Sequence, residues 1–222
     1  NNATVRLHRA RKALREQLGT GMVDTKKALE EADGDRDKAV EILRLKGAKG
    51  NAKRDDRSTS EGLVAARELP GQVTIIELAC ETDFVAKNER FIALAEKVVE
   101  AAAAAGAENA EAALAAPAGD VTVAQLIGDE AAIIGEKVEL RRVRTLKGDN
   151  FAVYMHKTSK DLPPQIGVVV AYSGDDAETA RSIAQHISFA NPSYLSREDV
   201  PAEEVEKERQ IVTAISREEG KP

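Results

Sequence analysis

Residues 73–99 read VTIIELACETDFVAKNERFIALAEKVV and join an apolar run to an amphipathic one. Residues 73–80 are rich in β-branched and other apolar side chains, which is typical of a buried strand. From residue 88 to residue 105 apolar side chains recur at helical spacing, and Asn88 can cap this segment through its side-chain oxygen. The stretch therefore predicts a strand followed by a long helix, with residues 81–87 as the connection between them.

Strands and helices alternate on both sides of this junction. Residues 63–67 and 73–80 predict a hairpin closed around Pro70 and Gly71. Further helices are predicted over residues 123–134, 176–189 and 202–219, and further strands over residues 138–146, 151–156 and 166–172. This order predicts an α+β core in two related halves, each an antiparallel sheet covered by helices. The last helix has only a narrow apolar seam, so we expect it to protrude from the core.

The chain before residue 62 differs in composition from this core. Its apolar spacing predicts three short helices that end near Gly47, the third of them capped by Asp35. The next residues are basic and polar, which is typical of a linker. The predicted parts are a three-helix domain over residues 1–47, a linker over 48–61, a first core subdomain over 62–136 and a second over 137–222.

Composition excludes several classes of function. The 222 residues carry 32 Lys and Arg against 38 Asp and Glu, a net charge of −6, and only 3% are aromatic with no Trp. An acidic chain with few rings for base stacking argues against direct nucleic-acid binding. Cys80 is the single cysteine, and His8, His156 and His186 lie far apart, so we expect no disulfide, metal or cofactor. No apolar run approaches bilayer length and no signal-peptide pattern is present, so we expect a cytoplasmic protein without membrane contact.

Motifs for catalysis are also missing from the sequence. It contains no phosphate-binding G-x-x-x-x-G-K-[ST] loop, no G-x-S-x-G elbow and no H-E-x-x-H helix. Cys80 follows an apolar strand without an adjacent base, which favours a small core residue over a nucleophile. The case for catalysis is therefore weak, and the residues leave two possibilities, a protein that acts on other proteins or a metal-free enzyme.

The connection after the predicted strand leaves two interpretations of one aromatic residue. Phe84 can fold back onto the following helix near Ile92 as a hydrophobic staple. Alternatively, it can stand at the tip of the connection as an anchor for a partner's pocket. Because large apolar side chains are usually buried, physical reasoning alone favours the staple.

Four motifs resemble one known family. Residues 80–88, CETDFVAKN, resemble the signature of translation elongation factor Ts. Residues 19–29, GTGMVDTKKAL, followed by ADGD at 32–35, are similar to a second signature of that family. Further matches are IGEKVELRR at residues 134–142 and VEKER at residues 205–209. The four lie in the family's order and extend over nearly the whole chain.

This resemblance implies a guanine-nucleotide exchange factor that promotes GDP release from elongation factor Tu during translation elongation without covalent chemistry, and so not an enzyme. It implies that the factor binds elongation factor Tu in both its GDP-bound and its nucleotide-free state. It implies an N-terminal domain similar to ubiquitin-associated domains and a two-part α+β core. It further implies that Asp83 and Phe84 insert beside the partner's Mg²⁺ and phosphate region, so that Phe84 is an anchor after all. The other residues that the resemblance assigns to partner binding are Thr82 and Val85, which shape the loop, then Met22, Val23, Lys26, Lys27 and His156.

Alternatives remain open for these residues and for the chain. Val23 can simply pack, Lys26 and Lys27 can be a solvated face, and His156 can be a lone strand-end histidine. The N-terminal domain can also make the chain a ubiquitin-associated-type adaptor that docks partners without nucleotide exchange. Longer members of the family continue past the last predicted helix, so we expect a C-terminally shortened chain or a naturally short version.

Overall fold

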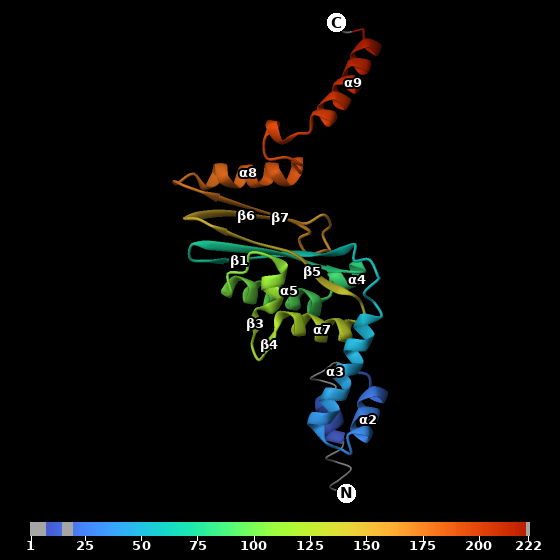
Figure 1. Cartoon of the computed structure of the whole chain (residues 1–222). Coiled ribbons are helices and arrows are strands. Elements are labelled where there is room, and N and C mark those ends of the chain that lie inside the picture. Colours follow the sequence, from blue (N-terminus) through green and yellow to red (C-terminus); the bar gives the residue numbers. More distant parts are fainter. Residues whose placement is uncertain (1–7, 15–19, 221–222) are drawn as a thin grey trace. The chain divides into compact units, whose positions relative to one another are not determined.

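A computed structural model describes residues 8–14 and 20–220 of the chain (Figure 1). The described residues up to 185 form one compact unit, and those from 186 onward form a second. Helices combine with antiparallel sheets in the first unit, which is consistent with the predicted α+β class. Among the described helices, none has both the length and the apolar character that a membrane span requires.

A three-stranded antiparallel sheet forms the centre of the first unit. Its strands β1 (Glu61–Leu69) and β2 (Gln72–Cys80) form the predicted hairpin. The third strand, β5 (Val138–Lys147), pairs with the other edge of β2, which gives the order β1-β2-β5. The predicted grouping of this strand with the second half of the core is therefore wrong. β2 is mostly buried, and a central strand needs hydrogen-bonding partners on both of its edges.

Helices cover one face of this sheet (Figure 1). They are α5 (Glu89–Ala104), α6 (Ala110–Ala115) and α7 (Val123–Ile134). Phe91 and Val98 of α5 are buried in one cluster with Leu78 and Val143 of the sheet. α5 and α7 agree with the predicted helices, whereas α6 and the short hairpin of β3 (Pro117–Ala118) and β4 (Val121–Thr122) were not predicted. These three elements are too short to produce a recognisable hydrophobic period.

A two-stranded sheet faces the other side of β1-β2-β5 (Figure 1). Strands β6 (Asn150–His156) and β7 (Ile166–Tyr172) pair antiparallel and agree with the predicted strands. The backbone N–H of Val64 in β1 donates to the carbonyl of Pro164, just before β7, at 2.8 Å and joins the two sheets. Helix α8 (Ala177–Ala190) follows β7 and buries Ala180 and Ala184.

The N-terminal helices share a small core of their own. Residues 8–14 are helical, and α2 (Met22–Glu31) and α3 (Arg36–Ala52) follow, with Leu14, Leu29 and Leu43 buried together. Asp35 caps α3 as predicted, accepting from the backbone N–H of residue 37 at 2.9 Å. The predicted helix end near residue 47 is wrong, because α3 packs on α7 and continues to Ala52 into the expected linker. The likeness to ubiquitin-associated domains and the domain boundaries remain predictions.

The second unit contains the end of the chain. A 3₁₀ turn, η1 (Arg197–Asp199), precedes α9 (Ala202–Glu218), which agrees with the last predicted helix. The Tyr194 hydroxyl donates to Glu204 at 2.7 Å and connects the segment before η1 to the first turn of α9. The apolar seam of α9, formed by Val205, Ile211, Val212 and Ile215, is exposed in the described residues. Whether this helix protrudes from the core stays a prediction.

Candidate functional site

The candidate site lies where β2 ends. The predicted connection between strand and helix contains one helical turn, α4 (Asp83–Ala86). Thr82 is its N-cap, and its hydroxyl accepts from the backbone N–H of Val85 at 3.4 Å. Asp83 in the first turn suits the positive end of the helix dipole. A four-residue helix leaves no periodicity in the sequence, which is why it was not predicted.

This turn has a buried side and an exposed side. Ala86 is fully buried and Val85 packs against the main core. Phe84 points the other way and is 72% exposed. The staple interpretation of Phe84 is therefore wrong. Val85 and Ala86 fill the inner positions of the turn, which leaves the Phe84 ring in solvent.

A lysine lies against the exposed ring. The ammonium nitrogen of Lys87 is 4.5 Å from the centroid of the Phe84 ring. The same nitrogen forms an ion pair with Asp83 at 3.2 Å, one helical turn back. A cation over an aromatic face is attracted by the ring quadrupole. Asp83 and Phe84 of α4 thus form one connected surface group with Lys87, the C-cap of the turn.

Glu136 holds the start of the loop. Its Oε2 accepts from the backbone N–H of Glu81 at 3.2 Å and of Thr82 at 3.1 Å. Its Oε1 accepts from the Thr82 hydroxyl at 2.7 Å. Sequence reasoning assigned no role to Glu136, although it lies in the quoted IGEKVELRR motif. No local pattern reveals the contact, because 54 residues separate Thr82 from Glu136.

A second carboxylate binds in the opposite direction. The Glu81 side chain accepts from the backbone N–H of Lys137 at 2.6 Å and pairs with Arg57 at 3.2 Å. Residues 81–82 and 136–137 therefore hold each other through two glutamates. We call this arrangement, formed by Glu81, Thr82, Glu136 and Lys137, the reciprocal clasp.

Cys80 lies beneath this clasp and is fully buried. Burial raises the pKa of its thiol to about 12, and the charges of Glu136 and Glu61 add to the effect. The thiol donates to the Thr82 carbonyl at 3.3 Å. A thiol that stays protonated at neutral pH is a poor nucleophile, which agrees with the predicted role as a core residue.

The residues predicted on the N-terminal domain lie on one face of α2. Met22, Val23, Lys26 and Lys27 are all exposed, whereas Thr25, Ala28 and Leu29 face the small core. Packing of Val23 in the core is therefore excluded. Lys26 pairs with Glu30 at 3.6 Å, a weak surface interaction.

His156 lies apart from the loop in sequence and in secondary structure. It is the last residue of β6 and is exposed. Its Nδ1 lies 3.1 Å from the Tyr154 hydroxyl. Within the described residues, no hydrogen bond or ion pair joins His156, the α2 face and α4 to one another.

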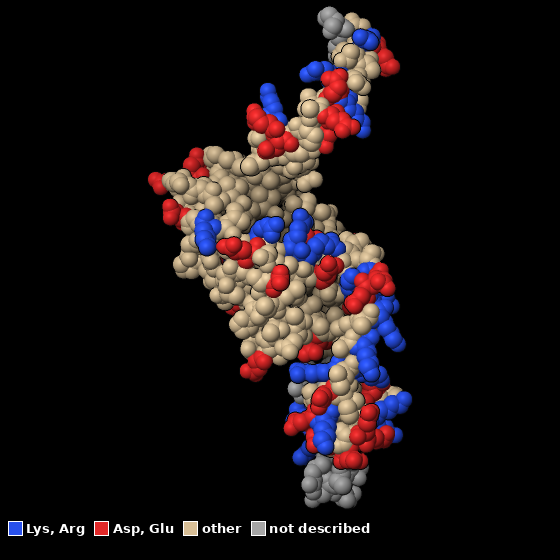
Figure 2. All heavy atoms as spheres, viewed as in Figure 1, with Lys and Arg blue, Asp and Glu red and all other residues tan. Residues whose placement is uncertain are grey.

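Charges of both signs mark the N-terminal helices, and the described residues form no metal centre. On the face shown in Figure 2, Lys and Arg side chains are intermingled with Asp and Glu side chains over α2 and α3. In residues 8–14 and 20–220, no three His, Cys, Asp or Glu side chains gather so that they could hold a metal ion. Among the described residues, Phe84 is one of the large apolar side chains exposed at the surface.

Comparison with known families includes the loop in a longer match. The family model described as Elongation factor TS matches residues 81–222, from the first residue of the clasp onward. The chain belongs to the elongation factor Ts family. This agrees with the resemblance that the four motifs indicated.

Relatives in the elongation factor Ts family are similar over most of the chain. Elongation factor Ts of Leifsonia xyli subsp. xyli is 75% identical over 212 residues, which cover 95% of this chain and 77% of the relative. The protein of the same name from Clavibacter sepedonicus is 70% identical, with the same coverage. That of Tropheryma whipplei is 54% identical over 94% of this chain and 76% of its own length.

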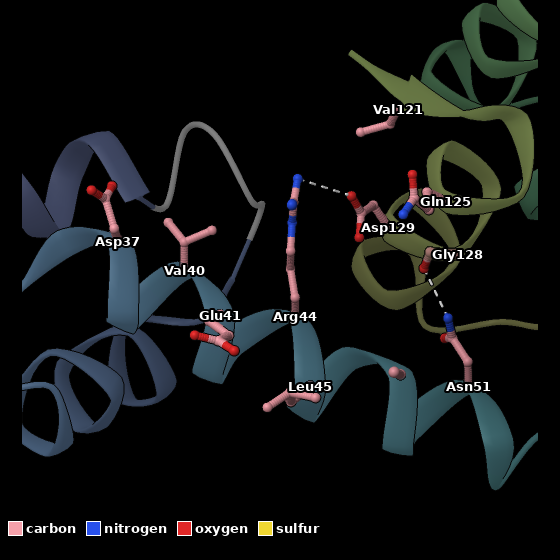
Figure 3. Close-up of a pocket in the computed structure, with 11 residues that line it drawn as sticks. Asp37, Val40, Glu41, Arg44, Leu45, Asn51, Val121, Gln125, Gly128 and Asp129 are labelled. Atoms are coloured by element: carbon pink, nitrogen blue, oxygen red, sulfur yellow. Dashed lines mark hydrogen bonds and ion pairs between the residues drawn. The ribbon is translucent and has the colours of Figure 1, made fainter. Parts of the chain in front are cut away.

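In this member of the elongation factor Ts family, α3 also docks on α7 (Figure 3). Arg44 pairs with Asp129 at 3.5 Å, and the Asn51 amide donates to the Gly128 carbonyl at 2.8 Å. The residues of both bridges line a cavity of about 490 Å³, which extends along α3 to Asp37. The helical N-terminal part is thereby attached to the same helix that leads into Glu136.

Proposed function

We propose that this chain accelerates GDP release from elongation factor Tu and that Asp83 and Phe84 enter the partner beside its Mg²⁺ and phosphate site. Membership of the elongation factor Ts family supports exchange on that partner. The observation that carries the proposed mechanism is the exposure of Phe84. Its side chain is 72% exposed, whereas Val85 and Ala86 of the same turn pack in the core.

The free energies involved suit such a contact. The factor and GDP compete for the best geometry of one site, so each weakens the binding of the other. The factor weakens GDP binding by the same ratio by which GDP weakens binding of the factor. Accelerating release by about 10⁴ requires a barrier lower by about 5.5 kcal/mol. Truncation of a central aromatic in an interface costs about 2–4 kcal/mol. One buried phenylalanine therefore supplies a substantial part of the effect, and a ring that is already exposed pays no unfolding cost to reach the partner.

The other loop residues have supporting roles in this mechanism. Asp83 holds Lys87 over the ring and presents a carboxylate to the partner. Thr82 caps the turn and Val85 anchors it in the core. Movement of the partner's Mg²⁺ site would remove the ion that neutralises the phosphates, which lowers GDP affinity.

Docking would come from the exposed residues outside the loop. Met22 and Val23 offer apolar side chains, and Lys26 and Lys27 offer positive charge, on one face of α2. We place His156 in a further contact with the partner's third domain. The nucleotide-free and the GDP-bound partner would both meet these surfaces.

An adaptor without exchange activity is not favoured. That alternative depends on the N-terminal three helices, whereas the family match covers residues 81–222. It predicts stable docking that is indifferent to Phe84. The same experiment therefore separates the two functions.

The experiment is release of fluorescent GDP from elongation factor Tu with catalytic amounts of the chain. We expect the parent to accelerate release and Phe84→Ala to lower the maximal rate by about tenfold to a hundredfold, or about 1.4–2.7 kcal/mol. Phe189→Ala is the matched control, because Phe189 is 91% exposed and lies outside the loop. Equal acceleration by the parent and Phe84→Ala would overturn the role of Phe84. Binding without acceleration by the parent would overturn exchange and restore the adaptor.

A further inference from the structure

The turn that presents Phe84 is too short to be stable on its own. α4 has four residues, and a first helical turn is unfavourable because it fixes several backbone dihedrals for one hydrogen bond. Val85 and Ala86 anchor its far end in the core. Its near end, at Glu81 and Thr82, needs another source of order.

Glu136 supplies that order through three donors. Both backbone N–H groups of residues 81 and 82, and the Thr82 hydroxyl, donate to its two carboxylate oxygens at 2.7–3.2 Å. Hydrogen bonds to an ionised acceptor are about twice as strong as neutral ones. Because the Thr82 hydroxyl also caps α4, the carboxylate fixes the residue from which the turn begins.

The segment that carries Glu136 is positioned by the end of α7 and the start of β5. α7 ends at Ile134, and Gly135 adopts φ +86°, a left-handed conformation that glycine reaches at low cost. This reversal brings Glu136 beside the end of β2, where Cys80 pairs with Val138 in the sheet. The bond from the Lys137 N–H to Glu81 then completes the reciprocal clasp.

We infer that Glu136 is a positioning residue for Phe84, an inference that rests on the proposed function. Without this carboxylate the turn is ordered for only a fraction of the time. A partner that binds only the ordered turn therefore finds fewer molecules of the factor with α4 in that conformation. Docking through α2 and His156 does not depend on the clasp, so the loss falls on the step in which the ring enters.

The kinetic test uses Glu136→Ala and Glu136→Gln in the full chain, with GDP release measured over a range of factor concentrations. We expect Glu136→Ala to lower the maximal rate about tenfold and to change the half-saturating concentration by less than about twofold. Glu136→Gln keeps one acceptor oxygen, so its maximal rate should lie between that of the parent and that of Glu136→Ala. Glu139→Ala is the matched control, since Glu139 follows closely on β5 but accepts from Thr59 at 3.1 Å, outside the loop.

A double-mutant cycle with Phe84→Ala separates positioning from a general loss of structure. If Glu136 acts through the ring, Glu136→Ala should lower the rate by less than about twofold once the ring is absent. Losses that multiply in the double variant would overturn the inference. An unchanged maximal rate in Glu136→Ala, beside a low rate in Phe84→Ala, would also overturn it while leaving the proposed function intact.

Amide hydrogen exchange of the free protein gives a readout that needs no partner. The amides of Glu81 and Thr82 should exchange at least about tenfold faster in Glu136→Ala, with core amides of α5 unchanged. The same amides should be unaffected in Glu139→Ala. If these two amides keep their protection in Glu136→Ala, the clasp does not order the loop and the inference fails. If the parent chain does not accelerate GDP release from elongation factor Tu, the proposed function fails. That outcome is independent of the amide exchange rates, which are measured on the free protein.

Discussion

The Lys87 ammonium lies 4.5 Å from the centroid of the Phe84 ring and 3.2 Å from the Asp83 carboxylate. The ion pair is an i,i+4 contact along one side of α4, so the lysine bridges the acid and the ring. A side chain held by two neighbours has fewer rotamers to lose on binding, and it also limits the positions that the ring can adopt. The exposed aromatic is thus oriented before any partner arrives.

Removal of the lysine charge should weaken exchange modestly. Lys87→Met keeps an apolar stem over the ring but loses the cation–π attraction, which is worth about 0.5–1 kcal/mol at an exposed site. We expect the rate of GDP release at subsaturating factor to fall about twofold to fivefold, and Lys87→Arg to retain most of the parent rate. A Lys87→Met rate equal to that of the parent would mean that the ring orients without the lysine.

Charge reversal on α2 should affect docking instead of release. The double change Lys26→Glu and Lys27→Glu should raise the half-saturating concentration several-fold and leave the maximal rate unchanged, because these side chains lie outside the loop. The effect should shrink at high salt, where exposed charges are screened. Lys97→Glu, an exposed lysine on α5, is the control. A lower maximal rate with unchanged half-saturation would contradict this assignment.

Cys80 should make stability depend on pH in the alkaline range. Its pKa is raised from 9.0 to about 12, mainly by burial. Below pH 9 the thiol is protonated in both the folded and the unfolded chain, so its contribution to stability is fully present. Between pH 9 and about 12 only the unfolded chain ionises, and the free energy of unfolding falls. Urea unfolding of the parent and Cys80→Ala should therefore show a difference in stability that decreases above pH 9; a constant difference would refute the shift.

Two glycines in α3 should respond differently to alanine. A Cβ at Gly50 would meet only the flexible end of Arg54, at 3.4 Å, whereas a Cβ at Gly47 would lie 3.0 Å from the Cβ of Ala132 in α7. Alanine in a helix interior is favoured over glycine by about 1 kcal/mol. We expect Gly50→Ala to raise the free energy of unfolding by about 0.5–1 kcal/mol, and Gly47→Ala to gain less or to lose stability. Urea unfolding followed by circular dichroism measures both, and equal gains would indicate that α3 and α7 pack less closely.

Much of the fold follows from local sequence signals. The limits of α7 agree with the prediction because Gly135 ends the apolar period, and β7 agrees because a short β-branched run stands between breakers. β5 was grouped with the wrong half of the core, since strand pairing depends on contacts between residues far apart in the chain. Within the site, the motif identified Phe84, but its exposure depends on Val85 and Ala86 occupying the inner positions. Glu136 had no local signal at all.

The reciprocal clasp also bears on how the protein is made. Glu136 follows Thr82 by 54 residues in the chain. Because chains are synthesised at roughly 5–20 residues per second, roughly 3–11 seconds pass between the synthesis of Thr82 and that of Glu136. During that interval the nascent chain already carries the TDFVAKN motif at residues 82–88 but lacks the carboxylate that orders it. On the inferred role of Glu136, the nascent chain gains full competence for the partner once Glu136 has been synthesised, and not when the motif itself leaves the ribosome.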